Sequence, residues 1–271
     1  MSDRSLNDRI AGALRQWGLP TDAVPAAVTC AASAVVIVDG PVAIVVLDRP
    51  PVNALSVETY VELAEVFRSL SVRDELSAVI LSAAGDRAFC AGADINERAT
   101  LGSDEAARRR REAAVASFYR ELATLPMPVI AAVGGACIGS GAVAVSLADI
   151  RVATTAAWFA LPEIDIRACG GGRHLMRVLP RGIVGELALT GRRMTADEAH
   201  RLGFVNCLTE PVDLAIRVRE YAVSLSKKHR PTLVATKNAL RLVEEMSLRD
   251  GFEFEQDTTF RLGMLDTENA Q

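Results

Sequence analysis

Three segments of the chain carry groups that could act together in catalysis. Residues 89–95 form a loop of small side chains, residues 136–142 contain closely spaced glycines, and residues 161–164 place Glu163 in an apolar stretch. Small residues let a ligand approach the backbone, and N–H groups at a helix start are unpaired and favoured by negative charge. Two such donors aimed at one point would stabilise an enolate-like oxygen by about 2–4 kcal/mol each, beside a carboxylate able to move a proton.

Strands and helices that alternate along the chain must position these segments, which indicates an α/β fold. Two β-branched runs, residues 35–38 and 42–47, predict a hairpin that turns at Asp39-Gly40. Short apolar runs predict strands over residues 78–82, 128–133 and 150–153. Helical periodicity predicts helices over residues 57–70 (with Ser56 as N-cap), 104–125, 139–148, 182–189, 196–202, 214–228 and 232–247.

The predicted elements divide the chain into three parts. Residues 1–34 are expected to be an N-terminal extension outside the main fold, with a short helix over residues 6–17 where apolar residues recur at helical spacing. Residues 35–210 form the predicted α/β core, and residues 211–271 a helical C-terminal region. No low-complexity linker separates the last two parts, so we expect them to pack together.

Composition argues against several classes of function. The formal net charge is −4, with 30 basic and 34 acidic residues interspersed, whereas nucleic-acid binding needs a concentrated basic surface. No apolar stretch is long enough to span a membrane, and no signal peptide precedes Pro20. The five cysteines are odd in number and lack metal-ligand spacing, which favours reduced thiols in a cytoplasmic protein and predicts no metal site.

Taken together in their order, the motifs resemble the signature of the crotonase, or enoyl-CoA hydratase/isomerase, family. The resemblance extends from about residue 35 to residue 268 and is highly specific as a set. The matching motifs are Asp48-Arg49-Pro50 with Asn53-Ala54-Leu55, residues 88–95, residues 128–135 with Ser140-Gly141, Asp149, Pro162-Glu163-Ile164, and residues 189–193 with 202–206.

The resemblance implies a crotonase-like spiral of ββα units, with a C-terminal helical region that forms trimers, often as a dimer of trimers. It implies an acyl-CoA substrate of the kind used in fatty acid metabolism, with CoA as part of the substrate and no separate cofactor. It also implies that Glu163 is the catalytic carboxylate, and that the backbone N–H groups of Ala93 and Ser140 form an oxyanion hole. The residues expected to bind CoA are Arg49, Val52, Ala54, Ala91, Gly92, Asp94 and Ile95.

One departure from the family pattern bears on the reaction. Hydratases of the family use two glutamates around the attacking water, and the first of them corresponds here to Val143. Valine cannot ionise or hydrogen-bond to water, whereas a single base can move a proton between two carbons. The sequence therefore favours double-bond isomerisation of an enoyl-CoA. Hydration of a 2-enoyl-CoA, a lyase activity, stays open if Asp165 or an unusual water arrangement replaces the missing acid. A non-catalytic acyl-CoA-binding role also stays open.

Further charged and polar residues have two interpretations each. Arg167 or Arg173 would suit a carboxylated acyl group, although surface arginines are the commoner case. The run Arg108–Arg111 is interpreted as a solvated helix face, because consecutive helical positions fan around the axis. A serine peptidase built on Ser140 is disfavoured, since Ile138 breaks the GxSxG pattern and no histidine lies in a partner motif.

Overall fold

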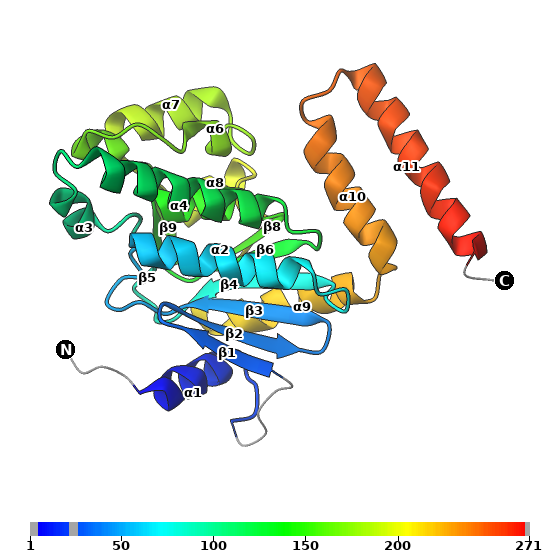
Figure 1. Cartoon of the computed structure of the whole chain (residues 1–271), viewed down its shortest axis with the longest axis horizontal. Helices are drawn as coiled ribbons and strands as arrows, with labels where there is room; N and C mark the ends of the chain where they lie inside the picture. Colours follow the sequence, from blue (N-terminus) through cyan, green and yellow to red (C-terminus); the bar gives the residue numbers. More distant parts are fainter. Residues whose placement is uncertain (1–4, 22–26, 269–271) are drawn as a thin grey trace.

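The main sheet of the protein has seven strands in the order β1-β2-β3-β4-β6-β8-β11 (Figure 1). The computed structural model describes residues 5–21 and 27–268. The first three strands are antiparallel and the rest join in parallel. Their bounds are β1 Ala27–Ala31, β2 Ala34–Asp39, β3 Val42–Leu47, β4 Ala78–Ala83, β6 Val129–Val133, β8 Ile150–Thr154 and β11 Cys207–Thr209. The predicted hairpin is confirmed, with Asp39 paired to Val42.

A second, four-stranded sheet has the order β10-β9-β7-β5. Its strands are β5 Ala88–Cys90, β7 Ala136–Ile138, β9 Trp158–Ala160 and β10 Arg193–Thr195. Three residues are too few for a periodic pattern, so the sequence did not predict these strands. Along the chain, β4 and β5, β6 and β7, and β8 and β9 each give one strand to each sheet, and helices follow each pair. This alternation is the predicted spiral of ββα units.

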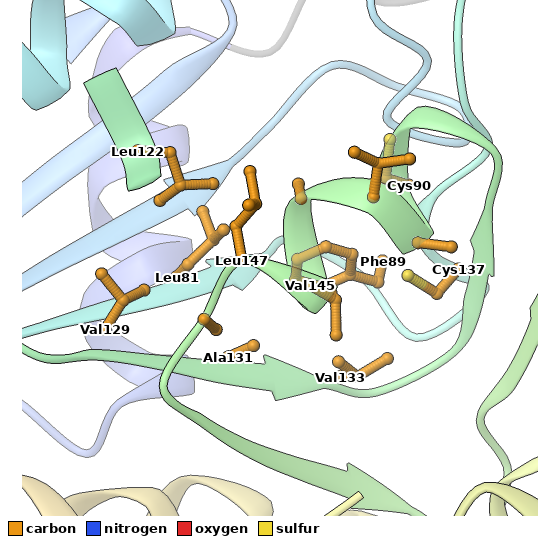
Figure 2. Close-up of a cluster of buried hydrophobic side chains, with 14 of the residues drawn as sticks. Leu81, Phe89, Cys90, Leu122, Val129, Ala131, Val133, Cys137, Val145 and Leu147 are labelled. Carbon is orange, nitrogen blue, oxygen red and sulfur yellow. The ribbon is translucent and has the colours of Figure 1, made fainter. Parts of the chain in front are cut away.

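Helices cover both faces of the main sheet. On one face lie α2 Val57–Ser71 and α4 Glu105–Ala123, which bury Tyr60, Phe67 and Phe118 between them and the sheet. Figure 2 shows part of this core, where Leu81 and Val129 of the main sheet approach Leu122 of α4. On the other face, α9 Leu214–Ser226 buries Val218 and Ala222. The central strands β3, β4 and β6 are therefore buried on both sides, as strands covered by helices on both faces are in α/β proteins.

The remaining helices connect and extend these layers. Every helix predicted from periodicity is present, within a few residues at each end. One long helix, α11, was not predicted. The bounds are α3 Ile95–Thr100, α5 Ser140–Ser146, α6 Gly172–Leu175, α7 Arg181–Thr190, α8 Ala196–Arg201, α10 Arg230–Val243 and α11 Leu248–Glu268, with 3-10 turns η1 Glu163–Ile166 and η2 Pro211–Asp213.

The described part of the N-terminal segment packs on the main fold, which corrects the expectation that it lies outside. The predicted helix is α1 Leu6–Gln16, capped by Ser5, and it lies under the sheet (Figure 1). Trp17 is only 2% exposed and joins the core that β2, β3 and α9 share. Strand β1, within the same segment, pairs with β2 along its length.

The C-terminal helices α10 and α11 form a hairpin at one side of the molecule (Figure 1). Lys237 fastens α10 to the core, donating to the Met127 carbonyl at 2.9 Å and pairing with Asp149 at 2.8 Å. Near the turn of the hairpin, Arg177 pairs with Glu244 at 2.7 Å. The described helices include none with the length and apolar character needed to cross a membrane.

The loop between β3 and α2 is held in shape by Asn53. Its side-chain amide donates to the carbonyls of Ala84 and Ala88 at 3.1 and 3.0 Å, and its Oδ1 accepts from the Arg49 N–H at 2.9 Å. Asn53 also has a positive φ of 55°, a conformation that asparagine tolerates better than most residues. One buried side chain therefore connects this loop to the start of β5.

Asn53→Ala should lower the free energy of unfolding by about 1–3 kcal/mol, because it leaves one buried carbonyl, one partly buried carbonyl and one N–H without their partner. Urea denaturation at fixed protein concentration would measure the change. The control is Asn238→Ala, on an exposed position of α10, which should stay within about 0.5 kcal/mol of wild type. Equal stability of the two variants would contradict the role given to Asn53.

Candidate active site

Three parallel strands of the second sheet end at the same place, and each is followed by one of the segments singled out from the sequence. β5 leads into Ala91–Asp94, β7 into Gly139-Ser140, and β9 into Leu161–Glu163. Ligands of open α/β sheets bind outside the carboxyl ends of the strands. A cavity of about 690 Å³ lies here, and Ala93, Ser140 and Glu163 all line it. The predicted catalytic residues are therefore brought together.

The carboxylate of Glu163 lies against the backbone at the start of α5. A Cβ atom on Gly139 would stand 2.6 Å from Glu163 Oε1, so only glycine fits there with the carboxylate in place. The other oxygen, Oε2, is buried and has no hydrogen-bond partner among the described residues. Burial raises the pKa of Glu163, while its own backbone N–H and the charge of Arg98 act in the opposite direction. Such an unpaired, half-buried carboxylate suits a proton-transfer group.

The two expected oxyanion donors lie on adjoining backbone segments. Gly92 has a φ of +90°, and a Cβ added to it would be 3.1 Å from the Ile138 carbonyl oxygen and 3.8 Å from the Ser140 nitrogen. Gly92 therefore allows the Ala93 segment to approach Ser140 closely. Neither the Ala93 N–H nor the Ser140 N–H donates to another group among the described residues. Both are available to an oxygen bound in the cavity.

Two tyrosines hold Ser140, and neither was identified from the sequence. The Tyr60 hydroxyl, from α2, donates to Ser140 Oγ at 2.7 Å, and the Tyr119 hydroxyl, from α4, donates to the Ser140 carbonyl at 3.5 Å. Burial raises the pKa of both tyrosines, so both stay protonated as donors. In the sequence they read as ordinary core positions of two amphipathic helices. Because Ser140 Oγ contacts a tyrosine and no histidine, the serine-peptidase alternative gains no support.

The position of Val143 agrees with the missing second carboxylate. Val143 is on α5, lines the cavity and faces Gly171, where an added Cβ would meet its Cγ2 at 2.7 Å. Asp165 was a candidate replacement acid. It is exposed, does not line the cavity, and faces Gly191, where an added Cβ would be 3.0 Å from its Oδ2. The candidate role of Asp165 is therefore wrong in this structure.

The expected CoA-binding residues form one connected group at the side of the cavity. Ala91, Gly92 and Ile95 line it directly. Behind them, Arg49 pairs with Asp94 at 2.8 Å and donates to the Ala54 carbonyl at 2.9 Å. A third link joins the Ala91 N–H to the Val52 carbonyl at 3.0 Å. Arg49, Val52, Ala54 and Asp94 thus shape the loop without lining the cavity itself.

More arginines line the cavity than the sequence predicted. Arg98, Arg108, Arg111 and Arg167 all contribute to its wall. Arg111 has a side chain only 14% exposed, which corrects its interpretation as part of a solvated helix face. Arg108 and Arg109 are exposed as expected, and Arg109 pairs with Glu105. Two arginines were considered for binding a carboxylated acyl group. Arg167 lines the cavity. Arg173 lies outside it, near Glu244 and Glu245.

Other side chains near the cavity either pack in the hydrophobic core or form no reactive or metal-binding site. Phe159 is buried against Phe204, and Trp158 stacks under Arg193, so neither lines the acyl cavity. Burial raises the pKa of Cys90 to about 12, which makes its thiol a poor nucleophile. Among the described residues no group of three histidine, cysteine or acidic side chains is arranged to hold a metal ion.

Comparison with known proteins agrees with this geometry. Residues 38–265 match the family model described as enoyl-CoA hydratase/isomerase. Carnitinyl-CoA dehydratase from Salmonella arizonae is 34% identical over 82% of this chain and 85% of its own, and short-chain-enoyl-CoA hydratase from Clostridium acetobutylicum is 32% identical over 81% and 85%. The solved enoyl-CoA hydratase from Mycobacterium smegmatis superimposes with a TM-score of 0.83 at 28% identity, over 86% of this chain and 92% of that one. This chain belongs to the enoyl-CoA hydratase/isomerase family.

Proposed function

We propose that the protein moves a double bond in an enoyl-CoA thioester, converting a 3-enoyl-CoA into the conjugated 2-enoyl-CoA. The observation that carries the proposal is the solitary carboxylate. Glu163 is unpaired and faces the cavity, and apolar Val143 occupies the position of the second carboxylate that hydration uses. A single base suffices for isomerisation because one group can remove a proton and return it elsewhere.

The reaction follows from the three groups at the strand ends. Glu163 removes a proton from C2 of the 3-enoyl group, and the electron pair of the C–H bond delocalises into a dienolate. The negative charge that develops on the thioester oxygen is stabilised by the N–H groups of Ala93 and Ser140, each worth about 2–4 kcal/mol. The protonated Glu163 then returns the same proton to C4, which leaves the double bond between C2 and C3.

The loop that Arg49 and Asn53 organise is proposed to receive the adenosine-diphosphate end of CoA. Its connection to Ala91, Gly92 and Ile95 supports this placement, because these residues line the cavity beside the oxyanion donors. The thioester would then enter the cavity from this side. The acyl chain would continue past Glu163 toward α4.

Hydration of a 2-enoyl-CoA, or the reverse dehydration, is the second candidate. The relatives named hydratase and dehydratase favour it. Apart from Glu163, the only carboxylate that lines the cavity within the described residues is Glu112, which pairs with Arg111 at 3.1 Å. Water would thus be activated by Glu163 alone, which is why we rank hydration below isomerisation.

We further propose that the protein is a homotrimer or a dimer of trimers, formed through the α10–α11 hairpin. Several large apolar side chains on this hairpin are exposed in the single chain, and contiguous exposed apolar surface marks contact sites. They include Leu240, Leu248, Phe252 and Phe260.

Glu163→Gln should lower the turnover of 3-hexenoyl-CoA by about 10²–10⁴-fold, because an amide cannot act as a base, while binding of the ligand persists. Absorbance of the conjugated product and calorimetric titration would measure the two effects. The control is Asp165→Asn, a neighbouring carboxylate outside the cavity, which should keep wild-type turnover. Wild-type rates in Glu163→Gln would indicate that the chain only binds acyl-CoA, and faster water addition to 2-hexenoyl-CoA than isomerisation of 3-hexenoyl-CoA would favour hydration.

The acid limb of kcat/KM should lie above pH 4.5, the ordinary pKa of a glutamic acid, because burial raises the pKa of Glu163 and only the ionised form acts as base. Activity is therefore present above the raised pKa and lost as the pH falls through it. Arg98→Met should move this limb to still higher pH, because the charge of Arg98 lowers the pKa of Glu163. Arg110→Met, outside the cavity, is the control, and an unshifted limb in Arg98→Met would contradict the assignment.

The double variant Phe252→Asp/Phe260→Asp should release monomers, because both side chains are more than half exposed in the single chain and would be buried in a trimer. Light scattering after size-exclusion chromatography would measure the mass. Glu253→Gln/Glu255→Gln on the same helix is the control and should keep the wild-type mass. A wild-type protein that runs as a monomer would refute the proposed assembly.

A further inference from the structure

The wall of the active-site cavity is cationic. Four arginines line it, Arg98, Arg108, Arg111 and Arg167, against two carboxylates, Glu112 and Glu163, so that the lining carries two net positive charges. A plain hydrocarbon chain gains nothing from such a wall, because placing cations beside apolar groups costs solvation energy. The arginines therefore indicate something about the acyl group that the family assignment leaves open.

Two of the arginines lie on the side of the cavity where the reacting carbons must be. Glu163 faces the carbons it deprotonates, and the charge of Arg98 is close enough to lower the pKa of that carboxylate. Arg167 follows Glu163 by one turn, at the end of η1, where its φ of 54° directs the chain back along the cavity through Ala168–Gly171. Both residues line the same cavity as Glu163.

Helix α4 supplies the other two arginines along a single stripe. Arg108, Arg111, Val115 and Tyr119 all line the cavity, at spacings of three and four residues. Tyr119 marks the oxyanion end, since its hydroxyl contacts Ser140. A helix advances 1.5 Å per residue, so Arg111 lies about 12 Å from Tyr119 along the axis. Along this stripe, the side chain nearest the thioester is polar, the next is apolar, and the two at the far end are cationic.

The positive charges are poorly neutralised by the protein itself. Neither Arg98 nor Arg167 forms an ion pair with any residue in the described part of the chain. Arg111 has a side chain only 14% exposed, while its partner Glu112 is 72% exposed, and a pair with one solvated member contributes little. At the loop proposed for CoA, by contrast, Arg49 is already held by Asp94. The unmatched charge is therefore in the cavity that holds Glu163, and not at the loop proposed for CoA.

We propose that the acyl group ends in a carboxylate, so that the substrates are ω-carboxyacyl-CoA thioesters, the monothioesters of dicarboxylic acids. Arg98 and Arg111 bind the distal carboxylate, with Arg167 beside them. A guanidinium suits this role because its fork of N–H groups matches a carboxylate in charge and shape. This inference rests on the proposed function in one respect, that a CoA thioester occupies the cavity.

Binding of unreactive ligands tests the inference separately from catalysis. Adipoyl-CoA and hexanoyl-CoA are saturated and equally long, and they differ in that a carboxylate replaces the terminal methyl group. Calorimetric titration should show wild-type protein binding adipoyl-CoA about 10- to 100-fold more tightly, as expected for charge-assisted hydrogen bonds. Arg98→Met/Arg111→Met, which keeps the apolar stems, should abolish this preference and leave the affinity for free CoA unchanged. Arg109→Met/Arg110→Met, from the same helix but outside the cavity, should keep it.

Two outcomes would overturn the inference. Equal or tighter wild-type binding of hexanoyl-CoA would mean that the acyl group is uncharged, and isomerisation of 3-hexenoyl-CoA by Glu163 would stand unaffected. An equal loss of affinity for CoA, hexanoyl-CoA and adipoyl-CoA in Arg98→Met/Arg111→Met would assign the arginines to the phosphates of CoA. If wild type bound none of the three ligands, the proposed function would fail together with this inference.

Discussion

The contact between Glu163 and the backbone of Gly139 is the constraint around which the active site is built. A Cβ atom on residue 139 would be only 2.6 Å from Glu163 Oε1, so the carboxylate packs directly against the backbone at the start of α5. The N–H of the next residue, Ser140, is thereby fixed beside Glu163. In the proposed reaction, a substrate oxygen bound at that N–H would have its neighbouring carbons within reach of Glu163, because both groups belong to the same junction.

The second sheet makes this junction possible. Its strands β5, β7 and β9 are only three residues long, yet each delivers one functional segment to the same edge. The register of the parallel pairs aligns the ends of the three strands with one another. The close approach at Gly92 then brings the Ala93 segment against the start of α5. Behind the site, Tyr60 and Tyr119 extend from α2 and α4 to hold Ser140, which ties it to the main hydrophobic core.

Burial gives the site its chemical character. Desolvation raises the pKa of Glu163, which makes it a stronger base than a carboxylate in water, and Arg98 limits the rise. The same burial would strengthen the hydrogen bonds proposed between the N–H groups of Ala93 and Ser140 and an enolate oxygen. Val143 adds apolar surface to the wall of the cavity. In the proposed function, these three effects together would favour moving a proton within the substrate over adding water to it.

The sequence by itself determined strands β2, β3, β4, β6 and β8 of the main sheet, most of the covering helices, and the motifs that contain Ala93, Ser140 and Glu163. These follow from local patterns, because periodicity of apolar residues and capping act over a few turns. Only the tertiary structure decided that Asp165 and Arg173 lie outside the cavity, that Arg98 and Arg111 line it, and that two tyrosines support Ser140. Strands of three residues carry no readable period, and the direction of a charged side chain depends on elements far away in the chain. Those decisions belong to long-range packing, which one-dimensional patterns do not contain.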